Sequence, residues 1–241
     1  MTLTSGVLVY LFKHGSHEWA PVFIMKKFEI QFNTITGPLP HTLTNDLMFR
    51  IVFEANQDAL KAFLCSLLHF KEEDIVSLEI KNPIKLGKRV EDKKYIYDIY
   101  LILNNQEKIH LELQVIQQDF WTERSLCYLC RDFGNLNAGD TYDKIQPLTQ
   151  IDLLDFDLYE GTTEFFSTYH LANDKTGRIY SGKLTLHVLQ LGKEVYATEE
   201  DKAYHIDHWA KLFKATTWVG TKPLLARLAF SLHENKEAYL C

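Results

Sequence analysis

The stretch that decides the fold is YIYDIYLILNNQEKIHLELQ, residues 95–114. Its first part, residues 95–103, is rich in aromatic and branched side chains, which favour β-strands. The polar run at residues 104–106 separates it from a second segment, residues 107–115, in which apolar and polar side chains alternate. Two such segments joined by a short polar connection predict an antiparallel hairpin.

Polar side chains stand at unexpected places in this hairpin. Apolar residues line both faces of the first strand, so we expect it to lie inside a sheet. Asp98 interrupts it, although aspartate is a poor strand former and is rarely buried unless it is paired or binds a metal. In the second strand His110, Glu112 and Gln114 share one side, because side chains alternate between faces. Such a side ordinarily faces water, but the neighbouring acid favours a site.

The register of the hairpin decides whether Asp98 and Glu112 converge. If the loop is residues 104–106, Leu103 pairs with Glu107 and Asp98 lies opposite Glu112. A loop one residue longer would put the two carboxylates on different faces. Two carboxylates that converge from neighbouring strands can bind Mg²⁺, which prefers oxygen ligands and usually keeps several waters.

Helices and strands flank the hairpin. Polar residues able to cap a helix precede residues 47–53, and Asn56 can cap a second helix. Further elements are expected as strands near 76–80, 149–154 and 184–188, and as helices at 121–133, after Thr198 and through 224–232. For the helix at 121–133 the spacing predicts a buried stripe of Leu126, Leu129, Cys130 and Phe133. This order of elements predicts an α/β protein with a mixed sheet.

The composition is that of an ordinary globular protein. The 241 residues are 46% hydrophobic and 24% charged, which is ample for a hydrophobic core. The formal net charge of −6 gives no general attraction to phosphate, so nucleic-acid binding would need a local basic patch. The four cysteines form no disulfide-dense framework, and the apolar stretch 6–12 is too short to span a bilayer. We therefore expect a cytoplasmic protein without membrane insertion.

Two pairs of potential metal ligands carry little weight. Cys127 and Cys130 have zinc-like spacing, but they lie in a predicted helix and lack a second ligand pair, so we expect both to be buried packing residues. His205 and His208 have no accompanying acidic motif, and we interpret them as core or interface histidines.

Several motifs together resemble one family. Asp98, followed after the hairpin by Glu112-Leu113-Gln114, resembles the D…(E/D)-x-K signature of the PD-(D/E)XK nucleases, in the E-x-Q form common in the PD-(D/E)XK nuclease family transposases, or recombination-promoting nucleases. NDLMFR at 45–50 resembles the opening D-x-x-F-K helix of that family, and ERSLCY at 123–128 resembles its R-x-x-x-Y helix. Residues 139–142 and 147–154 resemble the loop and strand that follow. The resemblance is close over 43–156 and looser beyond.

The resemblance implies a restriction-endonuclease-like α/β fold, with a mixed central sheet flanked by helices and a C-terminal helical region. It implies that Asp98 and Glu112 bind Mg²⁺ or Mn²⁺ and that Gln114 stands where the superfamily lysine positions or activates the attacking water. Gln114 can hydrogen-bond a water but cannot stabilise developing negative charge as an ammonium would. The nearest substitute is Lys94, on the Asp98 face of the strand. Asp46 would supply an upstream acid, with Glu54 as the alternative.

Basic and aromatic residues suggest where DNA would bind. The basic side chains ahead of the strand that carries Asp98 are Lys81, Lys85, Lys88, Arg89, Lys93 and Lys94. We expect Lys88, Arg89 and Lys94 in particular to contact phosphates, although a solvated loop explains the run equally well. Arg124 and Tyr128 lie one helical turn apart, so they could orient Glu112 or hold a phosphate. A salt bridge of Arg124 with Glu123 or Asp132 is the alternative.

The expected function is that of a metal-dependent DNA endonuclease, a deoxyribonuclease linked to recombination or mobile elements. The alternative is a catalytically inactive nuclease-fold protein that acts as a DNA-binding or protein-interaction module. DNA is the expected partner, and a homodimer is expected by analogy with nucleases that cut two strands with two copies. We expect three regions: a non-native or disordered leader at 1–24, a nuclease-like domain at 39–195, and a helical extension at 196–241 that reads as truncated.

Overall fold

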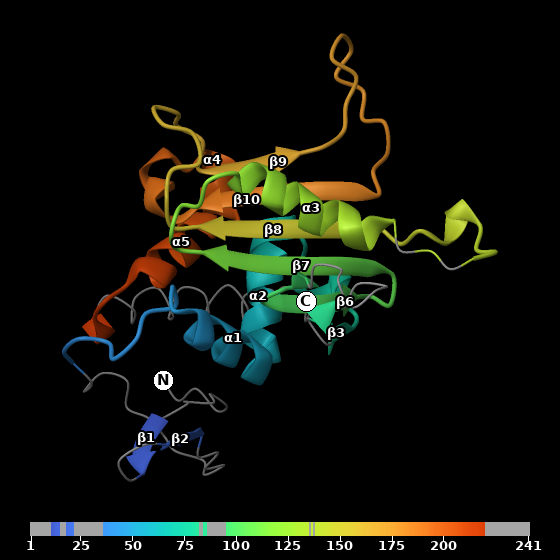
Figure 1. Cartoon of the computed structure of the whole chain (residues 1–241). Coiled ribbons are helices and arrows are strands. Elements are labelled where there is room, and N and C mark those ends of the chain that lie inside the picture. Colours follow the sequence, from blue (N-terminus) through green and yellow to red (C-terminus); the bar gives the residue numbers. More distant parts are fainter. Residues whose placement is uncertain are drawn as a thin grey trace, which may run out of the picture.

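The computed structural model describes residues 11–14, 18–21, 36–81, 84–85, 95–134, 136 and 138–219. A six-stranded sheet runs through the molecule in the order β3-β6-β7-β8-β10-β9 (Figure 1). Its strands are β3 (Leu78–Lys81), β6 (Ile99–Leu103), β7 (Glu107–Gln114), β8 (Leu148–Leu154), β9 (Phe166–Tyr169) and β10 (Leu184–Gln190). Strands β7, β8 and β10 are parallel and the other pairs are antiparallel, so the predicted mixed sheet is confirmed.

Two short pairs of strands lie outside this sheet. They are β1 (Leu11–His14) with β2 (Glu18–Pro21), and β4 (Ile84–Lys85) with β5 (Tyr95–Ile96). The sequence did not lead us to expect β9. It also predicted one continuous strand over 95–103, which is wrong. Residues 95–96 pair with β4, the chain bends at Tyr97 and Asp98, and β6 begins at Ile99.

The predicted register of the central hairpin is confirmed. Leu103 pairs with Glu107, and Ile99 pairs with Leu111. The turn holds because Asn104 and Asn105 adopt the left-handed backbone conformation that asparagine tolerates. The Asn104 side chain also accepts hydrogen bonds from the backbone nitrogens of Val76 and Ser77, which fixes the turn against the start of β3.

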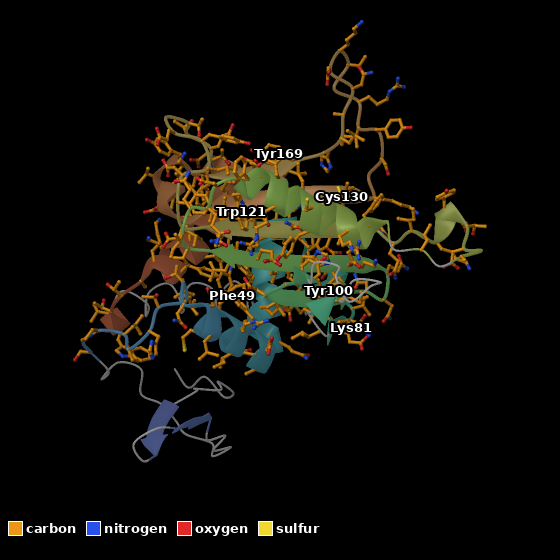
Figure 2. The ribbon with its side chains drawn as sticks, in the orientation of Figure 1. Phe49, Lys81, Tyr100, Trp121, Cys130 and Tyr169 are labelled. Carbon is orange, nitrogen blue, oxygen red and sulfur yellow. The ribbon has the colours of Figure 1, made fainter. Side chains whose placement is uncertain are left out.

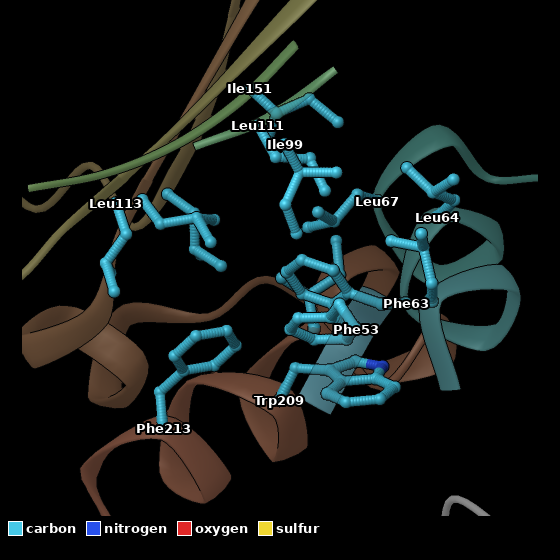
Figure 3. Close-up of a cluster of buried hydrophobic side chains, with 14 of the residues drawn as sticks. Phe53, Phe63, Leu64, Leu67, Ile99, Leu111, Leu113, Ile151, Trp209 and Phe213 are labelled. Atoms are coloured by element: carbon cyan, nitrogen blue, oxygen red, sulfur yellow. The ribbon is translucent and has the colours of Figure 1, made fainter. Parts of the chain in front are cut away.

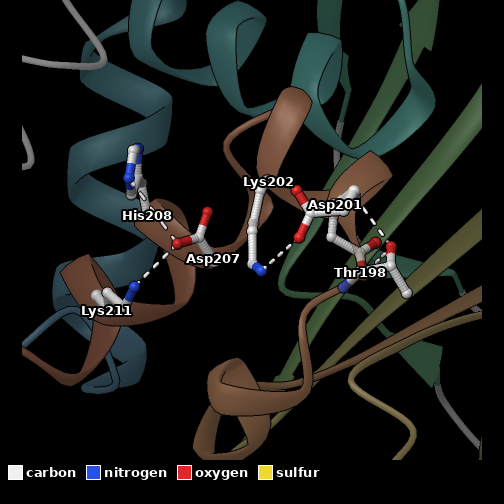
Figure 4. Close-up of polar contacts among 7 residues, drawn as sticks. Thr198, Asp201, Lys202, Asp207, His208 and Lys211 are labelled. Carbon is white, nitrogen blue, oxygen red and sulfur yellow. Dashed lines mark hydrogen bonds and ion pairs between the residues drawn. The ribbon is translucent and has the colours of Figure 1, made fainter.

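Side-chain caps mark the start of three of the five helices within the described residues. The helices are α1 (Asp46–Ala55), α2 (Gln57–Leu68), α3 (Trp121–Phe133), α4 (Glu199–Ala203) and α5 (Ile206–Lys214), with 3-10 turns η2 (Glu72–Asp74), η3 (Tyr142–Lys144) and η4 (Leu191–Tyr196). Asn45 and Asn56 cap α1 and α2 through their side chains. Thr198 and Asp201 form a reciprocal capping box at α4, and Lys211 pairs with Asp207 on α5 (Figure 4).

The main hydrophobic core lies between one face of the sheet and helices α1, α2 and α5 (Figure 3). The ring centroids of Phe53 and Phe63 are 5.1 Å apart, and those of Phe63 and Trp209 are 4.9 Å apart. The Trp209 indole donates to Ser66 Oγ at 3.0 Å, so α5 is tied to α2 inside the core. The domain boundary at residue 195 stays a prediction, with α5 packed into the core of the residues before it.

Helix α3 lies on the opposite face of the sheet (Figure 1). The predicted buried stripe is wrong in part, because Leu126 and Cys130 are exposed (Cys130 is labelled in Figure 2). The buried residues of α3 are Trp121, Ser125, Tyr128, Leu129 and Asp132. The sheet face beneath carries polar side chains, so the helix turns a partly polar stripe toward it. Cys127 is exposed as well, which corrects the expectation that both cysteines are buried.

Several predictions fall outside the described residues. They concern the helix through 224–232, most of the leader at 1–24, and the basic side chains Lys88, Arg89 and Lys94. Within the described ranges, no helix is long and apolar enough to cross a membrane.

Candidate active site

Asp98 lies at the bend between β5 and β6, and its neighbours hold this bend from two sides. Arg50 of α1 donates from Nε to the Asp98 carbonyl at 3.0 Å and from a terminal nitrogen to the Tyr97 carbonyl at 3.2 Å. The backbone nitrogen of Leu113 in β7 donates to Asp98 Oδ2 at 2.8 Å. The carboxylate is therefore positioned against β7, with one oxygen committed to the backbone.

Glu112 stands beside Asp98 on β7 and is only 5% exposed. The pairing of Ile99 with Leu111 brings Asp98 level with Glu112, as the sequence predicted. On the other side, the parallel register pairs Glu112 with Asp152 of β8. Three carboxylates thus stand side by side on three neighbouring chain segments, on the face that α3 covers.

Asp152 is a residue that the sequence reasoning missed. Its only signal was the alternation of Gln150 and Asp152 with apolar residues in the predicted strand. Ser125 Oγ donates to Asp152 Oδ2 at 2.5 Å, and Gln150 Nε2 donates to Oδ1 at 2.9 Å. Burial raises the pKa of Asp152 to about 6, against the opposing effect of these two hydrogen bonds and of Arg124. Both of its oxygens are engaged, so it acts as a fixed negative neighbour of Glu112.

Among the described residues, the charge of Glu112 is only partly compensated. Burial raises its pKa well above the ordinary value and the charges of Asp98 and Asp152 raise it further, whereas Arg124 and a hydrogen bond from the Asp98 backbone lower it. Its Oε1 atom is buried and has no hydrogen-bond partner among the described residues. Burial also raises the pKa of Asp98, although the bond from Leu113 opposes this shift. Such an arrangement is costly unless a cation completes it.

The donor set fits a magnesium-like ion that is not fully enclosed by protein. Within the described ranges, no three Asp, Glu, His or Cys side chains form a ready metal cluster. Mg²⁺ is usually held by one or two carboxylates together with waters and substrate phosphates, so two acids with an unpartnered oxygen suffice. Asp98 and Glu112 are the residues that would hold it.

The other predicted catalytic residues are Asp46, with Glu54 as its alternative, and Gln114. Asp46, the exposed first residue of α1, is near enough to Asp98 for its charge to raise the pKa of Asp98. Glu54 is exposed in the last turn of the same helix. Gln114 ends β7 on the Glu112 side, and its Nε2 donates to the Ile116 carbonyl at 2.6 Å. The Gln114 amide is therefore engaged with the following loop.

Arg124 and Tyr128 take different positions on α3. Arg124 donates to Gln118, and its guanidinium carbon lies 5.4 Å from the ring centroids of both Trp121 and Tyr128. Its charge lowers the pKa values of Asp98, Glu112 and Asp152 together, so it faces the acids. The Tyr128 ring is buried in an aromatic cluster with Tyr97 and Tyr100, which gives it a packing role.

The alternative pairing for Arg124 does not occur. Asp132 instead lies 3.1 Å from His110 Nε2 and 3.5 Å from Lys108 Nζ. The other acid considered, Glu123, is bonded by the Thr122 hydroxyl at 2.8 Å. Arg124 thus retains its orientation toward the carboxylates.

A mixed sheet flanked by helices, with paired acids at the bend before β6 and on β7, defines the PD-(D/E)XK nuclease fold. The family description "PD-(D/E)XK nuclease family transposase" matches residues 43–230, and the chain belongs to this family. Membership implies a nuclease linked to mobile elements and, with it, DNA as the partner. No curated protein and no solved structure matches the chain.

Proposed function

We propose that this protein is a metal-dependent DNA endonuclease that hydrolyses phosphodiester bonds with Asp98, Glu112 and Gln114 at its active site. The observation that carries the proposal is the buried Glu112 oxygen, which has no hydrogen-bond partner among the described residues, beside a second carboxylate that accepts a hydrogen bond from the Leu113 backbone nitrogen. Family membership supports the reaction class.

The residues of the chain divide the work as follows. Asp98 and Glu112 would hold Mg²⁺ or Mn²⁺, which supplies Lewis-acid polarisation of the phosphoryl oxygen and lowers the pKa of the attacking water. Gln114 would orient that water through its amide, which must first leave the Ile116 carbonyl. Arg124 faces the same acids and can balance charge on the phosphate.

Two further acids add negative charge around the proposed metal ligands. Asp152 keeps negative charge next to Glu112, which favours binding of a cation over an empty site. Asp46 adds a further acid close to Asp98 at the start of α1.

The proposed contacts with DNA phosphates are Lys88, Arg89 and Lys94. A homodimer would allow both strands of the DNA to be cut.

The experiment is cleavage of supercoiled plasmid with Mg²⁺ or Mn²⁺ by the wild type, Asp98→Asn and Glu112→Gln, with an EDTA arm. A matched control is Asp207→Asn, which removes a buried acid on α5, on the face of the sheet opposite to the one that α3 covers. We expect nicking that needs metal, is lost in both site variants and persists in the control. Cleavage by the folded site variants at the wild-type rate would refute the assignment.

A second function has its own supporting observation. Gln114 is neutral and its amide is bonded to the Ile116 backbone, so the position lacks the charge that a lysine would supply. A folded wild type that binds DNA without cutting it would identify an inactive DNA-binding or protein-interaction module.

A further inference from the structure

The loop between β7 and α3, residues 115–120, exposes two large apolar side chains next to the candidate site. Ile116 is 74% exposed and Phe120 is 77% exposed, whereas Leu113 and Trp121 on either side of the loop are buried. We refer to residues 115–120 as the rim loop.

The backbone of Phe120 is held in an unfavourable conformation. Its φ of 60° and ψ of 33° lie in the left-handed region, which is uncommon for a bulky aromatic residue and costs about 1–2 kcal/mol. The residue precedes Trp121, which is buried against Leu154 and Val188. The turn thus buries Trp121 and exposes Phe120 to solvent. Phe120 therefore combines a strained backbone conformation with an exposed aromatic ring.

Site residues anchor both ends of the rim loop. At its start, Gln114 donates to the Ile116 carbonyl at 2.6 Å. At its end, the Arg124 backbone nitrogen donates to the Phe120 carbonyl at 3.0 Å, and the Arg124 side chain donates to Gln118. Gln114 follows the proposed metal ligand by two residues, and Arg124 faces the carboxylates, so the rim loop borders the candidate site.

The chemistry of the rim loop suits a nucleobase better than a phosphate backbone. The loop contains no basic residue, and its polar members are Gln117, Gln118 and Asp119. An exposed aromatic ring offers a stacking surface that accepts any base, and glutamine amides can donate to and accept from base edges. A base inside an intact duplex is already stacked on its neighbours and cannot use this surface.

We propose that Phe120 and Ile116 stack against an unpaired base beside the scissile phosphate, so that the preferred substrate is DNA with single-stranded or unstacked nucleotides. This inference rests on the proposed nuclease function, since it names the DNA structure that the same site accepts. Phe120 supplies the stacking face, and Ile116 supports the flank of the base.

The test is binding of a single-stranded oligonucleotide that carries 2-aminopurine, compared with the same sequence as a duplex, in Ca²⁺ without Mg²⁺. For Phe120→Ala we expect loss of the change in 2-aminopurine fluorescence and roughly tenfold or more weaker single-strand binding. Duplex binding should change far less, Ile116→Ala should show a smaller effect, and Phe120→Trp should retain stacking.

Two matched controls remove equally exposed apolar side chains elsewhere. In Tyr142→Ala the changed residue lies in η3, which leads into the start of β8, whereas Asp152 lies near the end of that strand. In Val76→Ala the changed residue lies beside the hairpin turn at Asn104, which leads into the start of β7, whereas Glu112 lies near the end of β7. Both should bind single strands as the wild type does.

The outcomes separate this inference from the proposed function. Three results would overturn the stacking proposal, even if cleavage depends on Asp98. Phe120→Ala binds the single strand as tightly as the wild type does, or it loses the same affinity for the single strand and for the duplex. The third is that the wild type causes no change in 2-aminopurine fluorescence. Selective loss of single-strand binding in a protein that never cleaves would support stacking and refute the nuclease proposal.

Discussion

Glu112→Gln should stabilise the fold in EDTA near neutral pH while it abolishes metal-dependent cleavage. If the folded protein keeps Glu112 protonated, the free energy of unfolding of the wild type falls by about 1.4 kcal/mol for each pH unit above the ordinary pKa of 4.5. Glutamine does not titrate, and each ~1.4 kcal/mol that the substitution spares corresponds to a Tm increase of about 3–6 °C for a protein of this size.

The sign of the pH dependence follows from the raised pKa of Glu112 in the folded state. Below the unfolded pKa both states bind the proton, so the substitution should change nothing there. As the pH rises, only the unfolded state releases it freely, so the advantage of Glu112→Gln should grow toward pH 7. Mg²⁺ should narrow the difference, because it stabilises the wild type by binding the folded state.

The assay is urea unfolding followed by tryptophan fluorescence from acid to neutral pH, in EDTA and again in Mg²⁺. The contrasting variant is Asp152→Ala, which should destabilise the fold because the Ser125 hydroxyl and the Gln150 amide would both lose their acceptor in Asp152. A Glu112→Gln protein that is no more stable than the wild type at any pH would refute an only partly compensated acid at this position.

Three further changes probe other parts of the molecule. His187→Asn should remove a pH dependence, because burial and the neighbouring His170 and His69 lower the pKa of His187 from 6.5 to about 4. Relative to the variant, the wild type should lose about 1.4 kcal/mol of free energy of unfolding for each pH unit as the pH falls from 6.5 to about 4. The same pH dependence of urea unfolding in both proteins would contradict this prediction. Phe213→Ala should cost about 3–5 kcal/mol in urea unfolding if α5 belongs to the core, and a cost below about 1 kcal/mol would show that it does not. Arg50→Ala should weaken Mn²⁺ binding, measured by electron paramagnetic resonance, by roughly tenfold or more, with Arg50→Lys in between; unchanged binding would exclude a positioning role.

Local chemistry accounts for the features that the sequence predicted well. Asn56 could be placed as a helix cap, and the polar segment before residue 47 as the cap of another helix, because a cap bonds to a backbone nitrogen only three residues away. The turn at residues 104–106 was one of two loop lengths that the sequence allowed, and a turn determines every later pair of its hairpin. The structure has this turn, so Asp98 and Glu112 converge as expected for it.

Contacts between distant segments decided the rest. Asp152 meets Glu112 through parallel pairing of β7 and β8, and α3 separates these strands in the sequence. The bend at Asp98 depends on Arg50, which comes from α1. The predicted buried side of α3 is wrong in part because the sheet face beneath this helix carries buried polar side chains. An apolar stripe indicates the buried face of a helix only when the surface that the helix packs on is apolar. By itself the sequence determined helices α1, α2 and α3 and the central strands β7, β8 and β10, together with the two acids of the hairpin, because caps, turns and alternation act over a few residues. Tertiary structure alone decided the third carboxylate, the orientation of α3 and the exposed rim loop, because those depend on which distant surfaces meet.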